Sequence, residues 1–179
     1  LMDIREDFQM VVITGKNKKM YETFHKMIER SGAQSRVKLV FFTTEVEKYM
    51  QASDLLITKP GGLTISEALA CRLPLAVFDA IPGQEEDNAQ FLVDHGMGVR
   101  LENEQCGKVV GDLLAHPETL QRMQEACGQV DLAHTCEKIV ALIEELVQQE
   151  REESAPMEKK RPMLHFIKKR RTDTIHSTD

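Results

Sequence analysis

Residues 53–70 read SDLLITKPGGLTISEALA. The short apolar run from Leu55 to Ile57 stops at Pro60-Gly61-Gly62, and apolar residues at helical spacing follow it, which predicts a strand, a tight loop and a helix. Two glycines permit backbone angles that other residues avoid, and they let a ligand approach the main chain. The free N–H groups at the start of a helix favour a phosphate. The stretch therefore predicts an anion site, with Glu67 about one turn into the helix.

A second stretch has the same layout. The apolar run Leu75–Phe78 opens into a Pro82-Gly83 turn, and a helix with the polar first turn QEEDN follows. Strand candidates at 8–14, 37–42 and 98–101 also alternate with helical patterns, which argues for an α/β fold with a doubly wound, parallel, Rossmann-like sheet. Because the carboxyl ends of neighbouring parallel strands share one edge, we expect both Pro-Gly loops to face one crevice.

Length and composition fit one globular domain with a polar extension. The chain has 179 residues, of which 41% are hydrophobic, and this suffices for one core. Helical spacing continues to about residue 150, with a break expected near Gly128, while the composition turns polar from Gln148. We therefore predict a domain over residues 1–150 and a linker with a flexible basic tail over residues 151–179. No apolar run approaches the roughly 20 residues that cross a bilayer, and no signal pattern opens the chain, so a cytoplasmic location is expected.

The charge is unevenly distributed, and the cysteines do not form a metal-binding pattern. The formal net charge is −6, but residues 158–179 hold seven Lys and Arg against three Asp and Glu, so a basic tail follows an acidic body. The four cysteines form no C-x-x-C pair, and we expect them to be reduced, small apolar residues. A zinc site from Cys127, His134 and Cys136 does not match the common ligand spacings. No metal site is predicted.

Three motifs together resemble a known family. The runs ITGKNKK, TKPGGLTISEALA and IPGQEEDNAQFLVDHG look like the carboxyl-terminal half of the glycosyltransferases that make monogalactosyl- and glucosyl-diacylglycerol. These are related to the bacterial enzyme that adds N-acetylglucosamine to lipid I. The resemblance covers roughly residues 8–150. It implies the donor-binding half of an inverting, metal-independent GT-B enzyme, with two facing Rossmann-like domains, that uses UDP-glucose or UDP-galactose and no cofactor.

The resemblance also implies which residues bind the donor. In similar enzymes the residue matching Glu67 accepts hydrogen bonds from the ribose hydroxyls, the glycine turn admits the diphosphate, and the polar first turn of the next helix holds the hexose. The first loop reaches the phosphates or the acceptor, and the end of the second strand contacts uracil. The candidate donor-binding residues are Gly15, Asn17, Phe42, Thr43, Lys59, Gly61, Gly62, Thr64, Glu67, Gln84, Glu85 and Asn88.

Most of these assignments have a structural alternative. Thr64 and Glu67 fit a T-x-x-E capping box, in which the carboxylate only satisfies a backbone N–H group. The glycines fit an ordinary turn, Lys59 fits a solvated side chain, and Phe42 fits the core. The loop with Gly15 and Asn17 fits a hairpin-like turn, and the QEEDN segment fits a solvated first turn. The adjacent carboxylates Glu85 and Glu86 should point apart on a helix, so neither is assigned as a catalytic base.

By resemblance, the enzyme transfers a hexose to a lipid acceptor, which is diacylglycerol in the similar enzymes. We expect the acceptor pocket, the general base and the main membrane contact in an amino-terminal half that this chain lacks. No catalytic residue is therefore assigned here, and we expect a protein that is peripheral at the membrane. The alternatives are N-acetylglucosaminyl transfer to a polyprenyl-linked acceptor, a UDP-sugar 2-epimerase and a non-catalytic UDP-sugar-binding module.

The basic segment 159–171 has two basic clusters around the apolar residues Met163, Leu164, Phe166 and Ile167. Such a segment can help a protein dock on an anionic bilayer. The alternatives are a solvated tail and a nuclear-import-like or nucleic-acid-binding run. We expect an auxiliary membrane role and no nucleic-acid partner.

Overall fold

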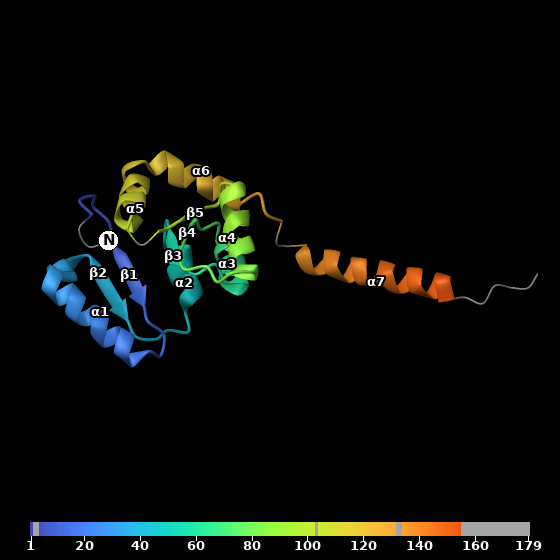
Figure 1. Ribbon diagram of the computed structural model, residues 1–179, viewed down its shortest axis with the longest axis horizontal. Helices are drawn as coiled ribbons and strands as arrows, with labels where there is room; N and C mark the ends of the chain where they lie inside the picture. The colour runs from blue at the N-terminus through green and yellow to red at the C-terminus, as the bar shows by residue number, and fades with distance from the viewer. Residues whose placement is uncertain (2–3, 103, 132–133, 155–179) are drawn as a thin grey trace, which may run out of the picture. The chain divides into compact units, whose positions relative to one another are not determined.

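The structure is a computed structural model that describes residues 1, 4–102, 104–131 and 134–154. It divides into a compact unit, Leu1–Thr135, and a second unit, Cys136–Asp179, and each is described by itself. The compact unit ends short of the predicted boundary at residue 150. Its elements, labelled in Figure 1, are β1 (Met10–Ile13), α1 (Lys18–Ser31), a 3-10 turn η1 (Ala33–Ser35), β2 (Val37–Val40), α2 (Val46–Gln51), β3 (Leu56–Thr58), α3 (Gly62–Ala70), β4 (Leu75–Val77), α4 (Gln84–Asp94), β5 (Gly98–Arg100), α5 (Cys106–Ala115) and α6 (Pro117–Cys127).

All strand pairs within the described residues are parallel, and helices alternate with strands, which confirms the predicted α/β class. The described strands form two sheets rather than the single sheet expected, one with the order β1-β2 and one with the order β3-β4-β5. In the second sheet Thr58 lies opposite Val77, and Val77 lies opposite Arg100. The turns after β3 and β4 therefore leave the same edge of this sheet.

Strand β1 begins two residues later than predicted. Phe8 is not part of the strand but packs with Leu55 and Ile57 on an apolar cluster that includes the buried Ile4 and Ala76. The Arg36 guanidinium lies 5.0 Å from the centre of the Phe8 ring, and it donates a hydrogen bond of 3.0 Å to the Ile4 carbonyl oxygen. Packing of this aromatic side chain thus keeps the start of the chain out of the sheet.

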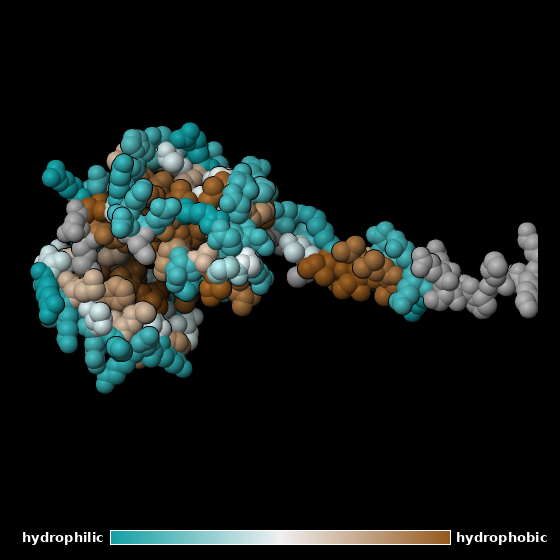
Figure 2. Space-filling view, in the orientation of Figure 1, coloured by the Kyte–Doolittle hydropathy of each residue, from teal (hydrophilic) through white to brown (hydrophobic). Residues whose placement is uncertain are grey.

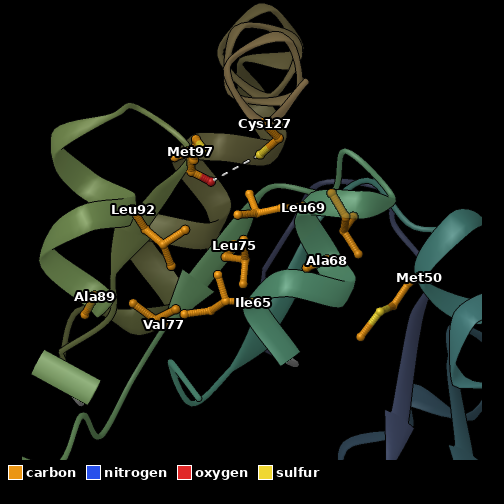
Figure 3. Packing of buried hydrophobic residues seen from close by; sticks show 11 residues of the cluster. Met50, Ile65, Ala68, Leu69, Leu75, Val77, Ala89, Leu92, Met97 and Cys127 are labelled. Carbon is orange, nitrogen blue, oxygen red and sulfur yellow. Dashed lines mark hydrogen bonds between the residues drawn. The ribbon is translucent and has the colours of Figure 1, made fainter. Parts of the chain in front are cut away.

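The larger apolar cluster lies against the β3-β4-β5 sheet and includes α3, α4 and α6 (Figure 3). Leu75, Ala76 and Val77 of β4 are all buried, as expected for the central strand of a parallel sheet covered on both faces. A side chain at Gly98 would place its Cβ 2.8 Å from the Leu75 carbonyl oxygen, so the approach of β5 to β4 needs a glycine. Figure 3 shows Cys127 reaching Met97, where its thiol donates a 3.8 Å hydrogen bond to the main-chain oxygen.

The long carboxyl-terminal helix α7 (Thr135–Ser154) extends into the polar segment where the linker is predicted. The helix runs through Gln148 to Ser154, because Gln, Glu and Arg are good helix formers although they cannot form a core. Figure 2 shows an apolar surface on its first part and a hydrophilic one near its end. No helix within the described ranges is long and apolar enough to cross a membrane. The basic segment 159–171 lies outside the described residues.

Candidate functional site

The turn between β3 and α3 presents main-chain amides at its surface. Helix α3 begins at Gly62 with Gly61 as its N-cap residue, and no side chain caps it. The Gly61 N–H donates to the Lys59 carbonyl oxygen at 2.8 Å, and the first bond of the helix runs from the Ile65 N–H to the Gly61 oxygen at 3.0 Å. The amides of Gly62, Leu63 and Thr64 therefore precede the first helical bond and have no acceptor within the helix. Such amides can bind an anion.

The position of the N-cap rules out the capping box as the explanation of Glu67. A T-x-x-E capping box needs its threonine at the N-cap, whereas Thr64 lies inside the first turn of α3. Glu67 is exposed and lines a pocket of about 260 Å³ between α2 and α3. The remaining lining residues are Val46, Glu47, Met50, Gln51, Ala70 and Cys71. Glu67 is thus available to a ligand.

The α2–α3 pocket is acidic as well as partly apolar. Two carboxylates, Glu47 and Glu67, and the Gln51 amide give it hydrogen-bond acceptors, while Val46 and Met50 give it an apolar surface. Burial, followed by the charges of Glu47 and Glu67, raises the pKa of the Cys71 thiol. Carboxylates repel a phosphate but accept hydrogen bonds from hydroxyl groups. The pocket therefore suits the sugar and base of a nucleoside better than it suits a phosphate.

Asn88 connects the second Pro-Gly helix to the first turn. Its Nδ2 atom donates a 3.0 Å hydrogen bond to the Pro60 carbonyl oxygen, and a Cβ atom at Gly62 would lie 4.0 Å from the same nitrogen. The structure thus brings α4 beside the β3–α3 turn, as the shared strand edge predicts. One N–H of this amide is thus bonded within the protein, which leaves Oδ1 and the second N–H of Asn88 for a ligand.

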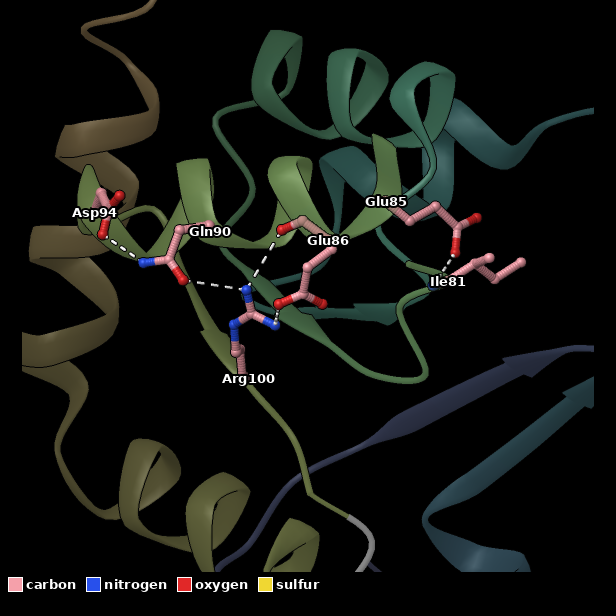
Figure 4. Close-up of polar contacts among 6 residues, drawn as sticks. All are labelled: Ile81, Glu85, Glu86, Gln90, Asp94 and Arg100. Carbon is pink, nitrogen blue, oxygen red and sulfur yellow. Dashed lines mark hydrogen bonds and ion pairs between the residues drawn. The ribbon is translucent and has the colours of Figure 1, made fainter. Parts of the chain in front are cut away.

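The carboxylates of Glu85 and Glu86 point apart, as predicted (Figure 4). Glu85 Oε2 accepts a 2.9 Å hydrogen bond from the Ile81 N–H, which leaves its other oxygen for a ligand. Glu86 forms a 2.8 Å ion pair with Arg100, which also bonds to Gln90. Gln84 is exposed at the start of α4. The N-cap residue Gly83 has φ +102, a value that L-residues rarely adopt, so the turn needs a glycine.

Lys59 is not simply solvated, because its Nζ atom lies 2.9 Å from Asp79 Oδ2. This hydrogen bond and the charge of Asp79 raise the pKa of Lys59, with a smaller contribution from Glu85. Sequence reasoning did not select Asp79. Its place directly after the apolar run 75–78 was a usable signal, since Lys59 follows the neighbouring strand at the same edge. Sequence reasoning likewise missed Glu47, Gln51 and Cys71 of the pocket.

The loops after β1 and β2 contact each other. Thr14 Oγ1 donates a 3.4 Å hydrogen bond to the Phe41 carbonyl oxygen, and Lys16 Nζ lies 4.9 Å from the centre of the Phe42 ring. Phe42 is half exposed, so the core interpretation is wrong for this residue. Asn17 Oδ1 caps α1 by accepting from the Met20 N–H at 3.0 Å.

The remaining candidates of these loops have local backbone roles. Gly15 has φ +61, and Thr43 Oγ1 accepts from the Glu45 N–H at 3.0 Å. The α2 helix that lines the pocket starts three residues after Thr43. Contact of Gly15, Asn17, Phe42 and Thr43 with a donor stays a prediction.

The described cysteines and histidines have local structural surroundings. Cys71, Cys106 and Cys127 are free thiols, and burial raises the pKa of Cys127 to about 11. His95 and His116 each contact a main-chain oxygen of their own helix through Nδ1, at 2.8 and 2.7 Å. No group of three His, Cys, Asp or Glu that could hold a metal occurs among the described residues, which leave out the side chain of Cys136.

Residues 1–136 match the model of the glycosyltransferase family 28 C-terminal domain. The chain belongs to this family. It is 32% identical over 136 residues to the processive diacylglycerol beta-glucosyltransferase of Bacillus subtilis, a match that covers 75% of this chain and 35% of that protein. It is 37% identical over 144 residues to the chloroplastic monogalactosyldiacylglycerol synthase 3 of Arabidopsis thaliana, which covers 79% of this chain and 30% of that protein. The family 28 chain thus spans about a third of the length of these relatives.

Solved structures confirm the GT-B type of fold. Anabaena HepE, whose crystal structure contains UDP-glucose, matches with a TM-score of 0.56 at 21% sequence identity. The match covers 79% of this chain and 41% of HepE. At this identity the likeness concerns the fold, and it confirms the Rossmann-like half predicted from the sequence.

Proposed function

We propose that this family 28 domain is the donor-binding half of an inverting, metal-independent glycosyltransferase that moves a hexose from UDP-glucose or UDP-galactose to a lipid acceptor. The observation that carries the proposal is the arrangement of α3. Its first amides suit a diphosphate, with Lys59 three residues before the helix as a further positive charge, and Glu67 in the acidic pocket suits ribose hydroxyls. Gly62 and Glu67 are about 7.5 Å apart along the helix axis, which is comparable with the span from a ribose to its second phosphate.

The charge pattern gives the leaving group its stabilisation. In an inverting transfer, an acceptor hydroxyl displaces the nucleotide diphosphate from the anomeric carbon, and negative charge grows on the phosphate oxygens. Helix amides and a lysine ammonium can stabilise that charge without a cation. Gln84, the second oxygen of Glu85 and Asn88 Oδ1 are at the start of the neighbouring helix and are proposed to hold the hexose.

The acceptor and the general base belong to the part of the protein outside this chain. We propose diacylglycerol as the acceptor, because the two relatives above are named for diacylglycerol products and substrates. Transfer of N-acetylglucosamine to a polyprenyl-linked acceptor is the second candidate. Binding of UDP-N-acetylglucosamine in preference to UDP-glucose would favour it, and release of a 2-epimer without any acceptor would favour an epimerase.

The donor site is tested by titration calorimetry of the chain with UDP, UDP-glucose and UDP-galactose in a chelator. We expect binding to persist without divalent metal and Glu67→Gln to weaken it by about 1–3 kcal/mol, as for a lost hydrogen bond to a charged group. Ser66→Ala is the matched control, because Ser66 Oγ only bonds to the Gly62 oxygen at 3.0 Å within α3. Loss of binding on chelation, or equal losses in both variants, would contradict the proposal.

We also propose that the protein works at the cytoplasmic membrane surface and that the basic segment 159–171 contributes to docking. Each basic side chain near an anionic surface contributes about 1 kcal/mol, so the seven basic residues of this segment can hold an otherwise acidic chain there. We expect the chain to sediment with anionic vesicles in a salt-sensitive way and to lose sedimentation without residues 158–179. The proposed docking role would be contradicted if the chain stayed in the supernatant at low salt, or if it bound nucleic acid in preference to vesicles.

A further inference from the structure

Lys59 and Asp79 lie together because their strands are neighbours. Thr58 and Val77 are partners in the parallel register of β3 and β4, and the Phe78 N–H still donates to the Thr58 oxygen at 3.2 Å. Lys59 and Asp79 therefore leave the sheet at the same edge, where Nζ and Oδ2 are 2.9 Å apart. The two side chains are 47% and 72% exposed, so a ligand can reach both partners.

The backbone on both sides of this ion pair is fixed in special conformations. Asp79 has φ +51, one of two positive values among the described non-glycine residues. Asp and Asn tolerate this left-handed region better than other side chains do. On the other strand, Lys59 accepts the Gly61 N–H at 2.8 Å in a three-residue turn around Pro60. The turns thus hold the ammonium and the carboxylate beside each other, on segments that leave the same sheet edge shortly before α3 and α4 begin.

Stability does not explain this arrangement well, because exposed ion pairs contribute little to folding. The pair has a clearer electrostatic effect, since the Asp79 carboxylate neutralises a lysine that lies three residues before α3, whose first amides have no side-chain cap. Glu85, whose charge also acts on Lys59, comes from the adjacent turn. An anion that approaches Lys59 therefore meets an ammonium that is already paired with a carboxylate.

We propose that Asp79 is an exchangeable counterion of Lys59, which releases the ammonium when a diphosphate binds and takes it back when the diphosphate leaves. The proposal rests on the proposed function, because it names the diphosphate of the nucleotide sugar as the competing anion. A diphosphate carries more negative charge than one carboxylate and also bonds to the helix amides, so it displaces Asp79. A singly charged anion does not. Asp79 thus positions Lys59, sets the selectivity for diphosphates and helps the product UDP to leave.

The test is Asp79→Asn, which keeps the size of the side chain and a residue type that tolerates φ +51. Calorimetry of the full chain with UDP, UMP and inorganic phosphate should show UDP binding about two- to fivefold tighter in this variant, the scale of an exposed ion pair. The preference for UDP over UMP should shrink. Glu86→Gln removes the same charge from a carboxylate that pairs with Arg100 instead, and it should change neither quantity.

A double-variant cycle separates this role from a structural one. If the exchange is correct, Asp79→Asn has no effect on UDP affinity in a Lys59→Gln background, because the contested ammonium is gone. Asp79→Gly replaces the asparagine variant if that one unfolds, since glycine accepts positive φ freely. Two results would overturn the counterion proposal and leave the proposed function standing. One is a wild-type chain that binds UDP as tightly as Asp79→Asn does. The other is an effect of Asp79→Asn on UDP affinity that is equally large in the Lys59→Gln background. A wild-type chain that binds no UDP at all would overturn the proposed function with it.

Discussion

The two sheets of the compact unit are built from similar β–α units but are covered differently. The β3-β4-β5 sheet has apolar clusters on both faces, and its central strand β4 is buried along its whole length. The β1-β2 sheet has one cluster, formed by Ile28, Ala33 and Val37 with partly buried neighbours. On its other face, Val11 and Ile13 are 41% and 37% exposed. The run MVVI is apolar throughout, yet its exposure alternates.

Because of this difference in packing, we expect one part of the candidate site to be rigid and the other part to be more mobile. The turn that carries Lys59 and Gly61 and the helix α4 that carries Asn88 both follow strands of the sheet that is packed on both faces. The loops with Asn17 and Phe42 extend from the sheet that is packed on one face. Regions with few buried apolar contacts open more easily than the core does. We infer that the proposed diphosphate and hexose contacts are preorganised, while the loops after β1 and β2 would adjust to a bound donor.

The strongest test of this comparison is a pair of leucine truncations. Leu92 of α4 is fully buried in the larger cluster, whereas Leu39 of β2 is only partly buried. Leu92→Ala should lower the free energy of unfolding by about 2–5 kcal/mol, because it removes apolar contacts and leaves a cavity. Leu39→Ala should cost about 1–2 kcal/mol, since less apolar surface is lost. Urea unfolding followed by circular dichroism measures both values.

Amide exchange of the unmodified chain provides the control for these truncations. We expect the amide hydrogens of β4 to exchange only when the whole unit unfolds, and those of β1 to exchange faster through local opening. Equal losses in the two leucine variants, together with equal protection of β1 and β4, would mean that the two sheets form one cooperative unit. The division of the candidate site into a rigid part and a more mobile part would then be wrong.

Much of this fold could be predicted because its signals are local. The Pro-Gly turns after β3 and β4 mark where strands end and helices begin, and the observed boundaries differ from the predicted ones by few residues. The helix through the polar segment from Gln148 to Ser154 was not expected, because polarity alone does not end a helix. The separation into two sheets was missed, because which strands pair with each other depends on tertiary packing and not on a local signal. The later start of β1 was missed as well, since no local signal shows that Phe8 packs on a cluster instead of extending the strand.

The candidate site was predictable in its main-chain part and less so in its side chains. Glycine turns and helix starts follow from residue type, so the amides of α3 were expected. The ion pair with Asp79 depends on a positive φ and on strand register, which the sequence does not show directly. The acidic pocket depends on how α2 packs against α3, a contact between segments with separate local patterns. Chemistry that arises from tertiary packing was therefore invisible until the fold was known.

The smallest effect we predict concerns Cys71, which lines the pocket beside Glu67 and Glu47. Burial and the two carboxylates raise the pKa of this thiol, and only the thiolate reacts with alkylating reagents. Alkylation of Cys71 should therefore be slow at neutral pH and accelerate above the ordinary range of a cysteine. Peptide mass spectrometry resolves it from Cys106 and from the buried Cys127, which should hardly react.

Ligand and charge should then shift the rate at Cys71 in opposite directions. Saturating UDP should protect the thiol if the nucleoside occupies the α2–α3 pocket, because the bound ligand covers this lining residue. Glu67→Gln removes one of the charges that raise the pKa, so alkylation of the unliganded variant at a fixed neutral pH should be about two- to threefold faster, the scale of a screened interaction. Ser66→Ala should leave the rate unchanged. Protection of Cys106 but not of Cys71 would place the nucleoside elsewhere and remove the pocket from the candidate site, while the proposed diphosphate contacts at the better-packed sheet would still stand.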